Sequence, residues 1–149
     1  RAMSHFGEHA AGWVVLSGVG ALLSRRRRRE WLLVGVGAVA AHAAAIAIKL
    51  VVRRSRPNHP AVAVNVGTPS ALSFPSAHAT SSTAAAMLLC RATRSPLPLV
   101  AVPLMALSRL VLGVHYPTDV LAGMAVGAAV AGTTARLGGR KQTPNAGGK

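Results

Sequence analysis

The stretch "RRRRREWLLVGVGAVAAHAAAIAIK", residues 25–49, decides the fold because it places five arginines directly before a long apolar block. From residue 31 to residue 48 the block contains no Asp, Glu, Lys or Arg. Its length is near the roughly 20 residues that a helix needs to cross the hydrocarbon core of a bilayer. The stretch therefore predicts a membrane helix with a positively charged end.

The composition of the whole chain agrees with a membrane protein. The 149 residues are 51% hydrophobic and carry a formal net charge of +14, with a mean hydropathy of +0.41. Lys and Arg gather between the apolar blocks, whereas a soluble amphipathic helix would show them at the helical period. Aromatic residues make up 3% of the chain and no nucleic-acid-binding module is recognisable, so we expect no nucleic-acid partner. The single cysteine, Cys90, excludes an intramolecular disulfide.

Apolar blocks recur along the chain. Backbone groups in lipid must pair within their own segment, so we expect an all-α membrane bundle of about five transmembrane helices, at residues 10–23, 31–48, 77–90, 96–112 and 120–137. The first block reaches spanning length only if it starts near Phe6, and the third only if it starts near Pro75. We expect residues 1–141 to form a single membrane domain and residues 142–149 to form a flexible tail.

The basic clusters predict the orientation of this bundle. They separate block one from block two and block three from block four, and they follow block five. Positive residues favour the cytoplasmic side. We therefore expect a multi-pass protein of the plasma (inner) membrane, with residues 49–76 and 113–119 at the extracytoplasmic face. The inverted orientation stays open, because residues 49–57 are also basic.

The basic segment "KLVVRRSRP", residues 49–57, has two interpretations. Its cations could extend from a helix end towards the polar interface, as long basic side chains commonly do. They could instead bind an anion. Lys49 and Arg56 are two helical turns apart and would share one face if the helix continued that far.

Three polar segments meet on the expected outer side, namely residues 49–57, "FPSAHAT" at 74–80 and "SRLVLGVHYPTD" at 108–119. Several cations around one small site repel one another unless an anion is bound, and the guanidinium fork matches phosphate. Proline favours a helix start, and we expect the N–H groups of Ser76, Ala77 and His78 to be unpaired there and able to bind an anion. We therefore expect a phosphate site made by Lys49, Arg56, Ser76, Ala77 and Arg109. A serine that only caps the helix is the simpler interpretation of "PSAH".

His115 and Asp119 are four residues apart. An aspartate that accepts one ring N–H fixes the histidine tautomer and makes the other nitrogen a better nucleophile. His78 would then protonate the leaving oxygen. Asp119 could alternatively only cap the next helix. The chain has three acidic residues, too few for a magnesium or two-metal centre, so we expect no metal and no cofactor.

Three ordered motifs carry a family resemblance. "KLVVRRSRP" fits K-x6-R-P, "PSAH" fits P-S-G-H with alanine for glycine, and "SRLVLGVHYPTD" fits S-R-x5-H-x3-D. The chain resembles the type 2 phosphatidic acid phosphatase superfamily, which includes vanadium haloperoxidases. The resemblance implies a helical bundle and metal-free phosphate ester hydrolysis through a phosphohistidine. It implies His115 as nucleophile, Asp119 as its partner and His78 as general acid.

The resemblance further implies a membrane lipid phosphate as substrate. Overall likeness favours members that act on a polyprenyl-linked phosphoribose in cell-wall arabinan precursor synthesis. Phosphatidic acid, phosphatidylglycerophosphate and polyprenyl diphosphate stay open as substrates. A vanadium-dependent peroxidase and a non-catalytic membrane protein that binds anionic lipid are alternatives of other classes. The oligomeric state is not predicted.

Overall fold

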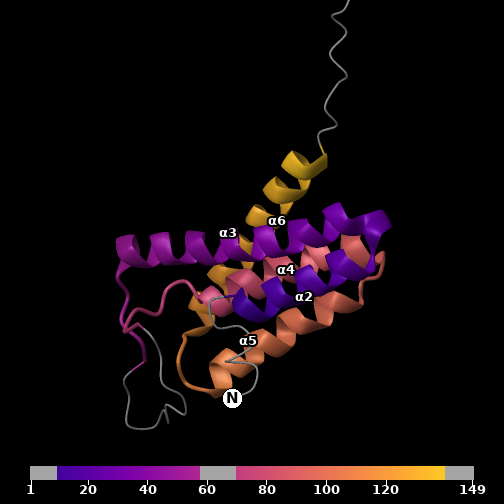
Figure 1. Cartoon of the computed structure of the whole chain (residues 1–149). Helices are drawn as coiled ribbons and strands as arrows, with labels where there is room; N and C mark the ends of the chain where they lie inside the picture. The colour runs from indigo at the N-terminus through magenta and orange to yellow at the C-terminus, as the bar shows by residue number, and fades with distance from the viewer. Residues whose placement is uncertain (1–9, 58–69, 140–149) are drawn as a thin grey trace, which may run out of the picture.

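The computed structural model describes residues 10–57 and 70–139, and within these ranges its regular structure is helical (Figure 1). The helices are α2 (Ala11–Leu23), α3 (Arg28–Val52), α4 (Ala77–Thr93), α5 (Ala101–Val111) and α6 (Pro117–Gly139), with short 3-10 turns η2 (Arg25–Arg27) and η3 (Leu97–Val100). Each α-helix coincides with one of the expected apolar blocks. The all-α prediction is confirmed for these residues.

Helix length and composition support a membrane position for part of the bundle. Within residues 10–57 and 70–139, two segments are long and apolar enough to cross a bilayer, Arg25–Val52 and Pro117–Gly139. The apolar segments Ala11–Leu23 and Leu97–Val111 are shorter. The expected extension of the first block to Phe6 and the expected tail at 142–149 lie outside the described residues. Helix α4 begins at Ala77, just after Pro75, and has 17 residues, and it is not among the segments of the described residues that are long and apolar enough to span.

Helix α4 is the central element and packs most closely on α3 and α6. Its alanines at 84, 85 and 86 are fully buried. Because its neighbours shield it, α4 also contains buried hydroxyls. Trp13 Nε1 donates to Ser82 Oγ at 3.2 Å, and Thr80 Oγ1 donates to the carbonyl of Ser76 at 2.8 Å. These hydrogen bonds allow a helix of modest hydropathy to form the core.

Two glycines allow α6 to approach α4. A Cβ on Gly123 would lie 2.7 Å from the carbonyl oxygen of Ser76. A Cβ on Gly127 would meet the carbonyl oxygen of Thr80 even more closely. The G-x-x-x-G spacing puts both glycines on one helix face, as in close helix contacts within membranes. This contact joins the start of α6 to the start of α4.

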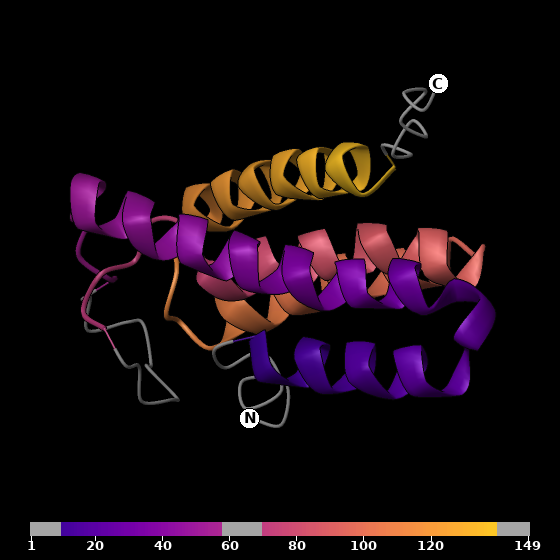
Figure 2. The same ribbon diagram turned by 45° about the horizontal axis from the view of Figure 1, so that its top comes forward.

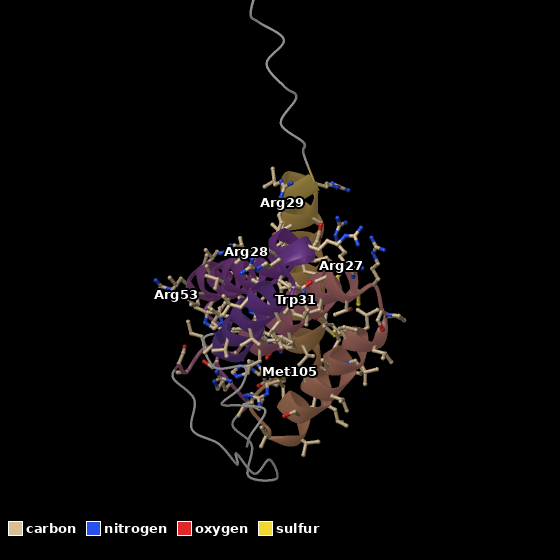
Figure 3. The ribbon with its side chains drawn as sticks, turned by 45° about the vertical axis from the view of Figure 1, so that its right-hand side comes forward. Arg27, Arg28, Arg29, Trp31, Arg53 and Met105 are labelled. Carbon is tan, nitrogen blue, oxygen red and sulfur yellow. The ribbon has the colours of Figure 1, made fainter. Side chains whose placement is uncertain are left out.

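The helices alternate in direction, so particular termini gather at each end of the bundle. The end of α3, the start of α4, the end of α5 and the start of α6 lie towards the left of Figure 1. Figure 2 shows α2 and α6 on opposite sides of α3. At the other end of the bundle η2 ends at Arg27, and α3 begins with Arg28, Arg29 and Trp31 in its first turns; Figure 3 labels these four residues. The polar segments of the expected site therefore lie at the end opposite this arginine cluster.

Candidate active site

Helix α3 ends one turn earlier than the Lys49 and Arg56 pattern requires. Arg53 adopts a left-handed conformation with φ 52°, and its N–H donates to the carbonyl of Lys49 at 2.9 Å. The expectation that Lys49 and Arg56 share one helix face is therefore wrong. Lys49 lies in the last turn of α3, whereas Arg56 follows in an extended segment.

The extended segment that follows α3 pairs with residues 70–73 instead of continuing as a helix. The N–H of Ser73 donates to the carbonyl of Arg54 at 2.7 Å, and the N–H of Arg56 donates to the carbonyl of Ala71 at 3.3 Å. Lys49 is 8% exposed and its Nζ donates to the carbonyls of Leu72 at 3.1 Å and Ser73 at 3.0 Å. This pairing turns the chain back over the end of α3.

Arg56 connects this segment to His115. Its Nε donates to the carbonyl of Ser70 at 2.8 Å, and its Nη1 donates to the carbonyl of Val114 at 2.7 Å. The same Nη1 lies 3.4 Å from His115 Nε2. Burial lowers the pKa of Arg56 below its usual value, and the charge of Asp119 partly opposes this effect. The guanidinium is thus a partly desolvated cation beside a histidine nitrogen.

His115 lies between that cation and a carboxylate. Its Nδ1 is 3.5 Å from Oδ2 of Asp119, and within residues 10–57 and 70–139 this buried nitrogen has no aligned hydrogen bond. Hydrogen bonds in unliganded active sites are often long and tighten with substrate. Burial, and after it the positive charges of Arg56, Lys49, Arg109 and His78, together lower the pKa of His115 to about 2. His115 is therefore a neutral imidazole at neutral pH.

The charges of Arg109 and His78 also act on His115 and contribute to its lowered pKa. Arg109, in the last turn of α5, is 3% exposed and its Nη2 donates to Ser108 Oγ at 3.3 Å. His78 lies in the first turn of α4 and is half-buried. Arg56 contacts His115, and the positive charges of Lys49 and Arg109 lie near enough to lower the pKa of the same histidine. Such a cluster is stabilised by a bound anion.

The start of α4 differs from the expectation in one respect. The N–H of Ser76 donates to the carbonyl of Asp119 at 2.9 Å, so the expectation that this N–H is unpaired is wrong. The Ser76 hydroxyl caps the helix by accepting from the N–H of Ala79 at 3.5 Å. Ala77 and His78 form the first helical positions. Ser76 therefore connects α4 to the start of α6, which the sequence pattern did not indicate.

Arg54 is a residue that the sequence analysis missed. Its Nη1 donates to Asp119 Oδ1 at 3.1 Å and to Thr118 Oγ1 at 2.8 Å. Its guanidinium lies 4.1 Å from the centroid of the Tyr116 ring. Arg53, Arg54 and Arg56 lie within four positions of one another, so the sequence pattern offers no basis for choosing among them. The only usable signal was that Asp119, the acidic residue of this segment, needs a cationic partner.

The described residues contain no group of three or more His, Cys, Asp or Glu side chains that could hold a metal ion. His5 and His9, spaced four residues apart, lie outside the described residues. The absence of a metal from the reaction remains a prediction from the residue types. All eight expected site residues, by contrast, lie at the same end of the bundle, on or directly beside the end of α3, the start of α4, the end of α5 and the start of α6.

Comparison with known proteins agrees with this arrangement. The family model described as PAP2 superfamily matches residues 30–142. A protein of Mycobacterium tuberculosis (strain CDC 1551 / Oshkosh), named decaprenylphosphoryl-5-phosphoribose phosphatase, is 62% identical over 142 residues, which cover 95% of this chain and 80% of the relative. A protein of the same name from Mycolicibacterium smegmatis is 69% identical over 123 residues, which cover 83% of this chain and 68% of the relative. No solved structure matches. The chain belongs to the PAP2 superfamily.

Proposed function

We propose that this chain is a metal-independent membrane phosphatase that hydrolyses a lipid phosphomonoester through a phosphohistidine. The observation that carries the proposal is the neutral His115 between Asp119 at Nδ1 and Arg56 at Nε2. A neutral imidazole with one nitrogen facing a carboxylate has a nucleophilic lone pair on the other. The cations beside that nitrogen provide the place where a phosphate group would bind.

The proposed reaction has two steps. Lys49, Arg56 and Arg109 bind the phosphoryl oxygens. The Ser76 hydroxyl and the Ala77 N–H donate further hydrogen bonds from the start of α4. His115 Nε2 attacks phosphorus, the bond from phosphorus to the alcohol oxygen breaks, and His78 donates a proton to that oxygen. A water then attacks phosphorus, His78 accepts the water proton, and the bond to Nε2 breaks to release inorganic phosphate. Asp119 stabilises the positive charge on His115 during both steps.

The substrate we propose is decaprenylphosphoryl-5-phosphoribose, and the product is decaprenylphosphoryl-ribose, an arabinan precursor for the cell-wall arabinogalactan. Support comes from the names of the relatives and from the extent of each match. The 5-phosphate is a monoester, whereas the phosphate between ribose and prenyl chain is a diester. A monoester phosphate presents more non-bridging oxygens to the three cations than a diester does. The site should therefore select the monoester.

We further propose that five helices cross the plasma membrane and that residues 1–141 form one domain. Large apolar side chains are exposed on the outer faces of several helices, including Leu22 at 75%, Val36 at 60% and Leu121 at 64%. Such exposure is costly in water and suits lipid. The arginine cluster at 25–29 favours the cytoplasmic side for that end. The active site at the other end would then be extracytoplasmic.

Phosphate release by the purified protein in detergent tests this function. The substrates are decaprenylphosphoryl-5-phosphoribose, phosphatidic acid, phosphatidylglycerophosphate and undecaprenyl diphosphate, all with EDTA present. We expect fastest release from the first substrate, loss of release in His115→Ala, and retention in His42→Ala, which changes a histidine within α3. Loss of release with EDTA, or full release by His115→Ala, would contradict the mechanism. If no substrate released phosphate, a non-catalytic lipid-binding role would replace it.

A further inference from the structure

Arg54 joins the end of α3 to the segment that carries the nucleophile. Its Nη1 donates to Thr118 Oγ1 at 2.8 Å and to Asp119 Oδ1 at 3.1 Å. Its guanidinium covers the ring of Tyr116, 4.1 Å from the ring centroid. One side chain therefore contacts three of the four residues that follow His115. Neither the three family motifs nor the names of the relatives assign it a role.

The two carboxylate oxygens of Asp119 have different partners. Oδ1 accepts from Arg54. Oδ2 accepts from the N–H of Tyr116 at 2.9 Å and faces His115 Nδ1 at 3.5 Å. Rotation of the carboxylate would break the contact with Arg54 and the hydrogen bond from Tyr116 together. Because the two oxygens belong to one rigid carboxylate, the hydrogen bond that holds Oδ1 also holds Oδ2, the oxygen that faces His115.

The Arg54 side chain is more exposed to solvent than the cations near His115. The Arg54 side chain is 39% exposed and Asp119 is fully buried, whereas Lys49 is 8% and Arg109 is 3% exposed. A buried carboxylate is stable only when it is paired or hydrogen-bonded. Arg54, at the partly exposed edge of the site, is the cation that pairs with Asp119. Arg54 donates hydrogen bonds to Thr118 and Asp119, whereas Arg56 contacts His115 directly.

We propose that Arg54 is a positioning residue that acts through Asp119. It holds the carboxylate in the orientation that keeps the proton of His115 on Nδ1 and leaves Nε2 free for attack, and it does not bind the transferred phosphoryl group. This inference rests on the proposed function. A partly exposed arginine could instead bind the substrate, and the two roles have different kinetic signatures. Loss of positioning lowers kcat, and loss of substrate binding raises KM.

A double-mutant cycle separates the two roles in the full-length protein. The variants are Arg54→Gln, Asp119→Asn and both together, with Arg54→Lys as the conservative change. For Arg54→Gln we expect kcat to fall by about 10- to 100-fold and KM to change by less than about 2-fold. Arg54→Lys should regain part of kcat because it keeps the charge. The double variant should be no slower than Asp119→Asn alone, since coupled residues are not additive.

Arg53→Gln is the matched control for these variants. Arg53 is the neighbouring arginine, and its Nε donates to the carbonyl of Leu50 at 3.0 Å within its own helix end. We expect its kcat and KM to equal those of the wild type. Additive losses in the double variant, or a raised KM with unchanged kcat in Arg54→Gln, would overturn the positioning role.

Histidine ¹⁵N NMR tests the same inference without activity. The His115 ring signal is assigned by its loss in His115→Ala. We expect a single tautomer, protonated at Nδ1, in the wild type and in Arg53→Gln, and a mixture of tautomers in Arg54→Gln. An unchanged tautomer in Arg54→Gln would overturn the inference even if no lipid were hydrolysed. Failure of the proposed function would appear separately, as absence of phosphate release by the wild type.

Discussion

Oδ2 of Asp119 lies 3.5 Å from Nδ1 of His115, one helical turn earlier in the chain, and both side chains are buried. The carboxylate thereby faces one ring nitrogen, while the other ring nitrogen faces Arg56. This relationship gives the two nitrogens different roles. It also determines what should happen when each member of the pair is changed.

Asp119→Asn should lower kcat by about 10³-fold or more, because an amide can present an N–H to Nδ1 and favour the wrong tautomer. Vanadate is used as a phosphate analogue. It should still bind to the variant, since Lys49, Arg56 and Arg109 are unchanged. Steady-state kinetics and vanadate inhibition measure the two effects. A variant with wild-type kcat would assign Asp119 a purely structural capping role.

His115 should stay neutral across the assay range. Its pKa is lowered to about 2 by burial and by nearby positive charges, so protonation of this ring should begin only in strong acid. Falling pH from about 8 to about 5 should leave the His115 ¹⁵N signals unchanged, whereas an ordinary histidine titrates in that range. Arg56→Gln removes one of the charges and should raise the pKa of His115. A wild-type signal that titrates near pH 6.5 would refute this prediction.

Gly127→Ala should destabilise the bundle. A Cβ at this position meets the Thr80 carbonyl oxygen and lies 2.9 Å from Thr83 Cβ, so α6 must move away from α4 at a cost of about 1 to 3 kcal/mol. Gly132→Ala is the control in the same helix, since a Cβ there has no atom within 4 Å. Thermal unfolding in detergent compares them. Equal melting temperatures for the two variants would contradict the close packing of α6 on α4.

Cysteine labelling should determine the orientation of the bundle. In a Cys90→Ala background, Ala71→Cys marks the active-site end and Thr93→Cys marks the arginine-rich end. We expect a membrane-impermeant maleimide to label the first variant in intact cells, and the second only after permeabilisation. The reverse pattern would show that the bundle is inverted and that the active site faces the cytoplasm.

The positions of the helices could be predicted because hydropathy alone decides which segments avoid water. The block at 31–48 corresponds to α3, although the helix starts inside the arginine run at Arg28 and continues to Val52. The exact end depends on the left-handed Arg53 and on pairing with residues 70–73. That pairing joins segments far apart in the chain. Periodicity carries no information about it.

The phosphatase class could also be predicted in outline. The three ordered motifs that contain Lys49, His78, His115 and Asp119 are typical of phosphoryl transfer, while the role of each of these residues stays a prediction. The interactions that support these residues were not predictable. Ser76 donates its N–H to the Asp119 carbonyl, and Arg54 pairs with the Asp119 carboxylate. Both interactions depend on how three helix ends meet, which one sequence does not encode in any local pattern.

Detection of a phosphorylated histidine tests the central claim most directly. The protein is incubated with decaprenylphosphoryl-5-phosphoribose, quenched under alkaline conditions that preserve phosphohistidine, digested and examined by mass spectrometry. Wild type and His78→Ala are compared, because His78 acts in both the formation and the hydrolysis of the intermediate and its loss should change the level of the phosphorylated protein. We predict an acid-labile phosphoryl group on His115 that is absent from His115→Ala. Phosphate release without any phosphohistidine in either protein, or phosphorylation at another residue, would contradict the mechanism.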